Sequence, residues 1–131
     1  MGHEDHSGEK MLVKNLRRCR RFVAGDGTDI CELLHPEREE EISMGYSLAH
    51  ARLGPGEASA PHRLKSSSEV YFILEGRGRM EIGGESAEVV AGQAIYIPPG
   101  ARQHIENRGD GPLAFLCMVS PPWREEDDEA A

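Results

Sequence analysis

The chain has 131 residues, a formal net charge of −8 at pH 7, 38% hydrophobic residues and 5% aromatic residues. This length is enough for one domain with one buried core, and so acidic a chain is poorly suited to bind nucleic acid or an anionic membrane surface. No apolar run approaches the roughly 20 residues of a membrane span, and the N-terminus lacks the apolar core of a signal peptide. We therefore expect a cytoplasmic protein.

Both ends of the chain are polar. We expect residues 1–11 to be disordered and residues 12–120 to form the domain. Residues 121–131 are Pro-rich and then acidic, which predicts a solvated tail, although Trp123 could still pack on the domain.

The cysteines are few and widely spaced. Cys19, Cys31 and Cys117 are odd in number and form no CxxC pair. Because neither a disulfide framework nor a metal-binding spacing is present, the sequence predicts reduced thiols, as expected in the cytoplasm.

Short apolar stretches bounded by glycine, proline or polar residues follow one another along the chain. We expect strands, in chain order, at residues 12–16, 30–34, 42–53, 62–64, 69–73, 80–82, 87–90, 94–97, 102–106 and 113–119. No convincing helix interrupts them. Many short strands with turn residues between them predict an all-β sandwich or barrel of antiparallel strands.

The hairpin between residues 56 and 76 carries the first candidate site residues. Side chains in a strand repeat every two residues, so His62 and Leu64 share one face of its first strand and Glu69 and Tyr71 share one face of its second. This pairing can bring an imidazole and a carboxylate, seven residues apart, to the inside of one hairpin.

The same stretch resembles the first motif of the cupin superfamily. The family pattern is matched by Gly56, His62, Glu69 and Gly76, while Leu64 stands where the family has a second histidine. The resemblance implies a double-stranded β-helix, or jelly-roll barrel, over roughly residues 42–119.

Residues 92–107 are similar to the second cupin motif. Gly92, Pro98, Gly100 and Asn107 match the pattern, while Gln103 stands where the family has its last histidine. Two ordered motifs separated by a short hairpin are a specific sign of the fold, and two replaced ligands make them a weak sign of the chemistry.

The resemblance implies a divalent metal ion inside the barrel. Carried over by position, the ligands would be His62, Glu69 and Gln103, with Glu69 as a ligand or a catalytic base. Such a site could hold Mn, Fe, Ni or Zn if water or substrate filled the open positions, although one imidazole, one carboxylate and one amide bind these metals weakly.

His104 is a fourth candidate ligand, one residue past the family position. In a regular strand, Gln103 and Ile105 point one way and His104 points the other. A β-bulge after residues 98–100 would shift the register and bring His104 into the pocket.

Apolar and aromatic residues near these positions are candidate pocket walls. They are Leu64, Tyr71, Met80, Tyr96, Ile105 and, if its face of residues 42–53 lines the barrel, His50. The same pocket, with His62, Glu69 and Gln103 as a hydrogen-bonded cluster, could instead bind a small-molecule ligand without metal, as a sensor or carrier.

A third reading is a structural or partner-binding protein. We expect a homodimer that pairs through its sheets, with residues 12–16 as a shared or exchanged strand that would cover a sheet edge.

Overall fold

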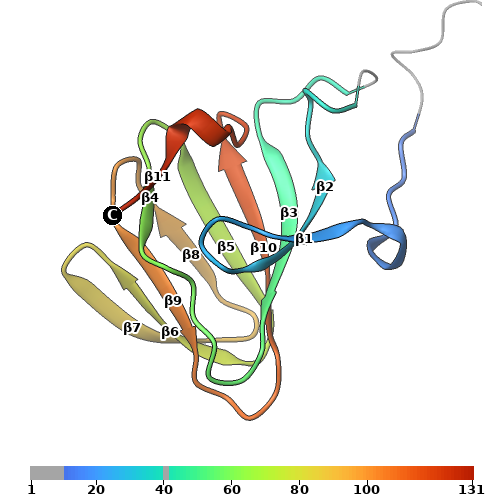
Figure 1. Ribbon diagram of the computed structural model, residues 1–131. Helices are drawn as coiled ribbons and strands as arrows, with labels where there is room; N and C mark the ends of the chain where they lie inside the picture. The colour runs from blue at the N-terminus through green and yellow to red at the C-terminus, as the bar shows by residue number, and fades with distance from the viewer. Residues whose placement is uncertain (1–10, 40–41) are drawn as a thin grey trace, which may run out of the picture.

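The computed structural model of the protein describes residues 11–39 and 42–131. The segment predicted to be disordered, residues 1–11, lies outside the described residues except for Met11. In the described part, two antiparallel β-sheets pack face to face, so the predicted all-β jelly-roll barrel is confirmed (Figure 1).

The larger sheet has six strands in the order β1-β2-β3-β10-β5-β8. Their bounds are Arg21–Val23 for β1, Asp29–Leu34 for β2, Ser47–Leu53 for β3, Leu113–Ser120 for β10, Ser68–Glu75 for β5 and Ala94–Ile97 for β8. The smaller sheet has five strands in the order β11-β4-β9-β6-β7. Their bounds are Asp128–Ala130 for β11, His62–Leu64 for β4, Gln103–Asn107 for β9, Arg77–Ile82 for β6 and Glu85–Val90 for β7.

The core fills the space between the two sheets. Strands of this barrel alternate between buried and more exposed residues, as the two-residue period of a strand requires. The largest apolar side chains that are almost fully buried are Leu53, Ile73, Ile97, Ile105, Leu113 and Phe115.

Glycine and proline end the strands where the sequence predicts. Gly76 adopts a φ of 87°, and a Cβ at that position would overlap the carbonyl oxygen of Pro112, so only glycine fits this turn between β5 and β6. Strand β8 ends at Ile97, because the following Pro98 and Pro99 have no backbone N–H to donate.

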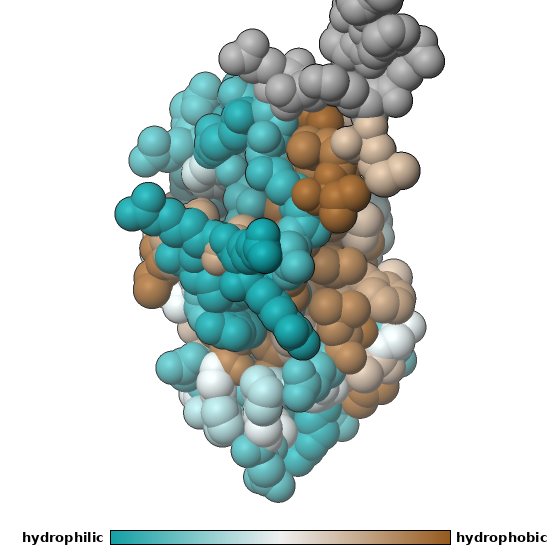
Figure 2. Space-filling model, turned by 90° about the vertical axis from the view of Figure 1, so that its right-hand side faces the viewer, coloured by the Kyte–Doolittle hydropathy of each residue, from teal (hydrophilic) through white to brown (hydrophobic). Residues whose placement is uncertain are grey.

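The outer face of the larger sheet is apolar over β10, β5 and β8. Leu48, Met118, Val70 and Tyr96 are successive cross-strand partners on β3, β10, β5 and β8, and Tyr96 is 63% exposed. In the next row, Leu116 pairs with Phe72 and Phe72 with Ala94. Figure 2 shows a continuous apolar band along one side of the molecule.

The N-terminal segment differs from the prediction. Residues 12–16 form no strand: the side chain of Asn15 accepts a hydrogen bond from the Arg17 backbone N–H and begins the short 3-10 helix η2, Leu16–Arg18. The first strand is instead β1, at the edge of the larger sheet.

The prediction of reduced thiols is wrong for two of the three cysteines. Cys19 and Cys31 form a disulfide that ties the segment before β1 to β2. The sequence hides this pairing, because only the fold brings two cysteines 12 residues apart next to each other. Cys117, buried on β10, has no disulfide partner among the described residues.

The tail at residues 121–131 is part of the barrel, so the predicted solvated tail is wrong. It contains the 3-10 helix η3, Glu125–Asp127, followed by β11, which pairs antiparallel with β4. Asp127 is only 4% exposed, and its carboxylate accepts hydrogen bonds from the backbone N–H groups of Ser66 and Ser67 and from the Ser66 hydroxyl. These bonds offset the cost of burying the charge.

Replacing Asp127 with alanine should therefore lower the free energy of unfolding by about 2–4 kcal/mol, because the backbone N–H groups of Ser66 and of the buried Ser67 would lose their acceptor. Urea denaturation measures the change. The matched control is Glu126→Ala next to it, whose side chain is 74% exposed. If both variants were equally stable, the tail would not be held as described.

Candidate functional site

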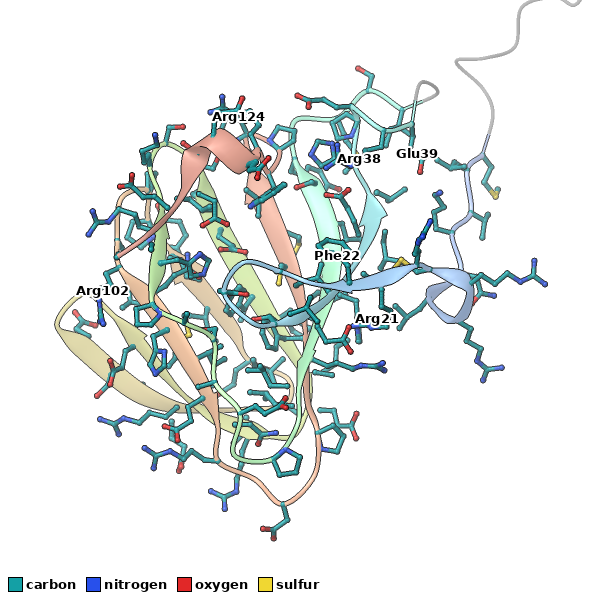
Figure 3. All side chains as sticks on the ribbon, in the orientation of Figure 1. Arg21, Phe22, Arg38, Glu39, Arg102 and Arg124 are labelled. Atoms are coloured by element: carbon teal, nitrogen blue, oxygen red, sulfur yellow. A yellow bond between two sulfur atoms is a disulfide. The ribbon has the colours of Figure 1, made fainter. Side chains whose placement is uncertain are left out.

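A cavity of about 90 Å³ lies between the sheets, where β4 and β11 face β2, β3, β5 and β10. Its polar lining includes His62, Glu69, Asp26 and Asp128. The rest of the lining is largely apolar and aromatic: Phe22, Ile30, Ala49, Ala51, Leu64, Tyr71, Phe115, Cys117, Val119 and Trp123. Phe22 and its neighbour Arg21 point to opposite sides of β1, so only Phe22 faces the cavity (Figure 3).

Glu69 is held on β5 by a chain of two side-chain hydrogen bonds. The Tyr71 hydroxyl donates to Gln103 Oε1 over 2.9 Å, and Gln103 Nε2 donates to Glu69 Oε1 over 3.1 Å. The amide of Gln103 is thereby fixed in one orientation. Burial raises the pKa of Glu69 from 4.5 to about 7, although the Gln103 donor and the charge of His62 act in the opposite direction.

His62 lies on β4, between two carboxylates. Its Nδ1 is 2.9 Å from Asp128 Oδ1, while its Nε2 is 3.4 Å from Asp26 Oδ2. Nε2 is buried and has no hydrogen-bond partner among the described residues. Burial lowers the pKa of His62, but the hydrogen bond to Asp128 and the charges of Asp26, Asp128 and Glu69 outweigh it, so the net pKa is raised.

Two site residues, Asp128 and Asp26, are not predicted by the sequence. Asp128 lies in the segment predicted to be a solvated tail, yet its carboxylate accepts a hydrogen bond from the indole Nε1 of Trp123 over 3.0 Å and also faces His62. Burial raises the pKa of Asp128, but its hydrogen bonds with His62 and Trp123 lower it by more. Asp26 lies in the turn between β1 and β2, where Gly25 and Gly27 suggested only a turn. No local pattern marks either residue.

Of the six predicted pocket walls, two line the cavity, and Met80, Ile105, Tyr96 and His50 do not. Leu64 and Tyr71 face it. Met80 and Ile105 are buried farther along the barrel, in the apolar core. Tyr96 is wrong as a pocket residue, because alternation on β8 turns Ile95 and Ile97 inward and leaves Tyr96 exposed.

The two other candidate histidines lie outside the cavity. On β3, Ala49 and Ala51 face the cavity, so His50 points to the outer face, where Arg21 Nη2 lies 3.2 Å from its Nδ1. Burial and the charge of Arg21 lower the pKa of His50. On β9, His104 Nδ1 bonds the Ser59 carbonyl oxygen at 2.6 Å. The pairing of β9 with β6 contains no bulge, so nothing turns His104 inward.

The donor set does not fit the metal site that the resemblance implies. Leu64 has no donor atom, and both polar atoms of the Gln103 amide are engaged by Tyr71 and Glu69. Among residues 11–39 and 42–131, no group of three or more His, Cys, Asp or Glu side chains is arranged to hold a metal ion. The function proposed below therefore involves no metal ion.

Comparison with known proteins defines the class of this protein. The family model described as "Cupin domain" matches residues 49–119, which is more than half of the chain. The chain therefore belongs to the cupin family. Within the described residues, no helix is long and apolar enough to cross a membrane.

Known relatives span nearly the whole chain. An uncharacterized protein of Methanocaldococcus jannaschii is 39% identical over 120 residues, covering 92% of this chain and 94% of the relative. The crystal structure of a "predicted oxalate decarboxylase" from Thermotoga maritima matches with a TM-score of 0.73 at 24% identity, over 84% of this chain and 99% of that one. The Streptomyces protein Pac13, described as "a unique nucleoside dehydratase", matches with a TM-score of 0.74 at 18% identity. The match covers 93% of this chain and 92% of Pac13. These two structures share the fold.

The pKa of Glu69 predicts how stability depends on pH. A carboxyl group whose pKa is raised in the folded state stabilises the fold below pH 4.5, and this contribution is lost as the pH rises through about 7. Glu69→Gln removes the ionisation and can still accept the Gln103 hydrogen bond. At pH 8 we expect this variant to be more stable than the wild type by on the order of 3 kcal/mol, with little difference at pH 4.

Urea unfolding across this pH range measures the effect. Glu75→Gln, on the exposed end of the same strand, is the control and should follow the wild type. If the free energy of unfolding of Glu69→Gln depended on pH as strongly as that of the wild type, Glu69 would not be the buried acid described.

Proposed function

We propose that the cavity binds a small organic molecule and that Glu69 and His62 transfer protons to and from it without a metal ion. One observation carries this proposal: the buried carboxyl group of Glu69, whose pKa is raised to about 7, lines the same cavity as the imidazole of His62, whose Nε2 lacks a hydrogen-bond partner among the described residues. Groups that titrate near neutral pH are the most effective acids and bases at that pH.

The roles of the side chains follow from their contacts. Glu69, held by Gln103, is the base that removes a proton from the bound molecule. His62, held by Asp128 at Nδ1, presents Nε2 as the acid that protonates another atom of that molecule. Such a pair supports isomerisation or elimination of water. A protein of the same fold that is described as a nucleoside dehydratase supports elimination, by analogy of fold alone.

We also propose that the protein is a homodimer. The apolar outer face of the larger sheet supports this, because a face of this kind marks an interaction site. A second copy of the chain is the occupant, because an identical apolar face can cover this one. The predicted exchange of residues 12–16 plays no part, because they form no strand.

A cytoplasmic location remains a proposal with less support than the sequence suggested. The prediction rested partly on reduced thiols, and Cys19 and Cys31 form a disulfide.

A fragment screen by thermal shift in the presence of EDTA tests the binding site. We expect at least one small polar compound to raise the melting temperature of the wild type, and Glu69→Gln to lose most of that shift, while Glu75→Gln keeps it. The bound compound, incubated in D2O with the wild type, should gain deuterium at carbon. Compounds that bind without gaining deuterium would indicate a carrier and not an enzyme. A rise in melting temperature that requires an added metal ion would contradict the proposal.

Light scattering at several protein concentrations tests the dimer. Leu74→Glu adds a charge to the edge of the apolar outer face, at a side chain 44% exposed, and should shift the protein toward monomer. Val90→Glu, on the other sheet and 43% exposed, is the matched control and should leave the dimer intact. A wild type that remains monomeric at high concentration would rule the dimer out.

A further inference from the structure

Two hollows meet at His62. The inner cavity of about 90 Å³ adjoins an outer hollow of about 270 Å³, and both are lined by Asp26, His62, Trp123 and Asp128. A molecule can therefore place one end in the inner cavity and extend through the outer hollow. The inner cavity is smaller than the roughly 150 Å³ that accommodates a benzene ring, so the buried end must be small.

The lining of both hollows is acidic. Among the described residues, neither lining includes lysine or arginine, and His62 is the sole basic side chain in either. The acidic lining residues are Asp26, Glu32, Glu69, Glu125, Asp128 and Glu129.

Ion pairs neutralise only part of this charge. Glu32 is paired with Arg38 at 2.7 Å, and Glu129 with Arg63 at 3.5 Å. Asp26 and Asp128 share a single cationic partner within the described structure, which is His62. With Glu69 ionised, the cavity therefore carries net negative charge, which repels carboxylates and phosphates and attracts cations.

Aromatic side chains are concentrated at the same place. The chain contains one Trp, three Tyr and three Phe, and four of these seven line the inner cavity. They are Phe22, Tyr71, Phe115 and Trp123. Aromatic rings together with carboxylates are the combination that recognises ammonium groups, because the ring face attracts a cation while excluding water.

An unsatisfied polar atom points to a ligand independently of the charges. The His62 side chain is about nine-tenths buried, and its Nε2 has no hydrogen-bond partner in the described part of the chain. With Nε2 protonated, as its proposed role as an acid requires, it can donate to an oxygen atom of the bound molecule, while Asp26 and Glu69 balance the positive charge of the ammonium group. A buried polar atom of this kind is costly unless something satisfies it.

We propose that the ligand of this cavity is a small organic amine bound as its ammonium cation, an inference that rests on the proposed function of the same cavity. The ammonium end occupies the inner cavity among the aromatic rings, and the rest of the molecule lies in the outer hollow. This ligand class differs from oxalate, the anion named for a structural neighbour.

Titration calorimetry with charge-matched probes tests the inference. The probes are ethanolamine, its neutral counterpart ethylene glycol, methylammonium and oxalate, all at pH 8 with EDTA. Trp123, the only tryptophan in the chain, gives a second readout through its fluorescence. We expect both cations to bind with Kd below about 10 mM and ethanolamine to bind at least about tenfold more tightly than the neutral diol.

Two pairs of variants locate the binding. Phe22→Leu keeps an apolar side chain at the half-exposed rim but removes the ring, and should weaken ethanolamine binding about two- to fivefold. Its control is Tyr46→Leu, at a 44% exposed aromatic residue outside both hollows. Asp26→Asn should weaken ethanolamine binding about five- to tenfold, and Asp110→Asn, on an exposed turn, should not.

The inference is overturned if the neutral diol binds as tightly as ethanolamine, if oxalate binds more tightly than either cation, or if neither cation binds. The fragment screen separates this failure from that of the proposed function. If another compound stabilises the protein in a manner that depends on Glu69, the acid–base site stands and only the ligand class is wrong. If no compound stabilises the protein, both the acid–base site and the ligand class are wrong.

Discussion

The hydrogen bond between His62 and Asp128 joins the last strand of the chain to the first motif hairpin, and the site depends on it. It fixes the orientation of the imidazole, and it favours the protonated ring beside a carboxylate. The pairing of β11 with β4 and the buried Asp127 hold Asp128 in place. The chemistry proposed for the cavity therefore depends on the C-terminal strand as well as on the two motifs.

The replaced ligands of the motifs form a coherent alternative to a metal site. Gln103 supplies a donor that orients Glu69, and its own oxygen is held by Tyr71. Leu64 contributes an apolar wall, which helps to keep the carboxyl group dry and its pKa high. A barrel that keeps one imidazole and one carboxylate of the motif can thus exchange metal binding for acid–base chemistry.

The sequence predicted the parts of the structure that depend on local pattern. Alternation and turn residues gave the strands, and motif spacing placed His62, Leu64, Glu69, Tyr71 and Gln103 at or beside one cavity. Alternation alone could not say which face of a strand points inward, which is why Tyr96 was misplaced and His50 was left undecided. The contributions of Asp26 and Asp128 could not be predicted, because they depend on segments that meet only in the folded barrel. The Cys19–Cys31 disulfide could not be predicted for the same reason, because its two cysteines meet only in the folded barrel.

The central claim is that Glu69 is a buried acid that titrates near neutral pH beside a fixed imidazole. Carbon-13 NMR titration of the Glu69 carboxyl group, in protein prepared without metal ions, measures this directly. A pKa close to 7 is the result that the structure predicts. A pKa near 4.5, the ordinary value for a glutamate in water, would mean that the carboxyl group is solvated and that the cavity does not hold the proposed acid–base pair.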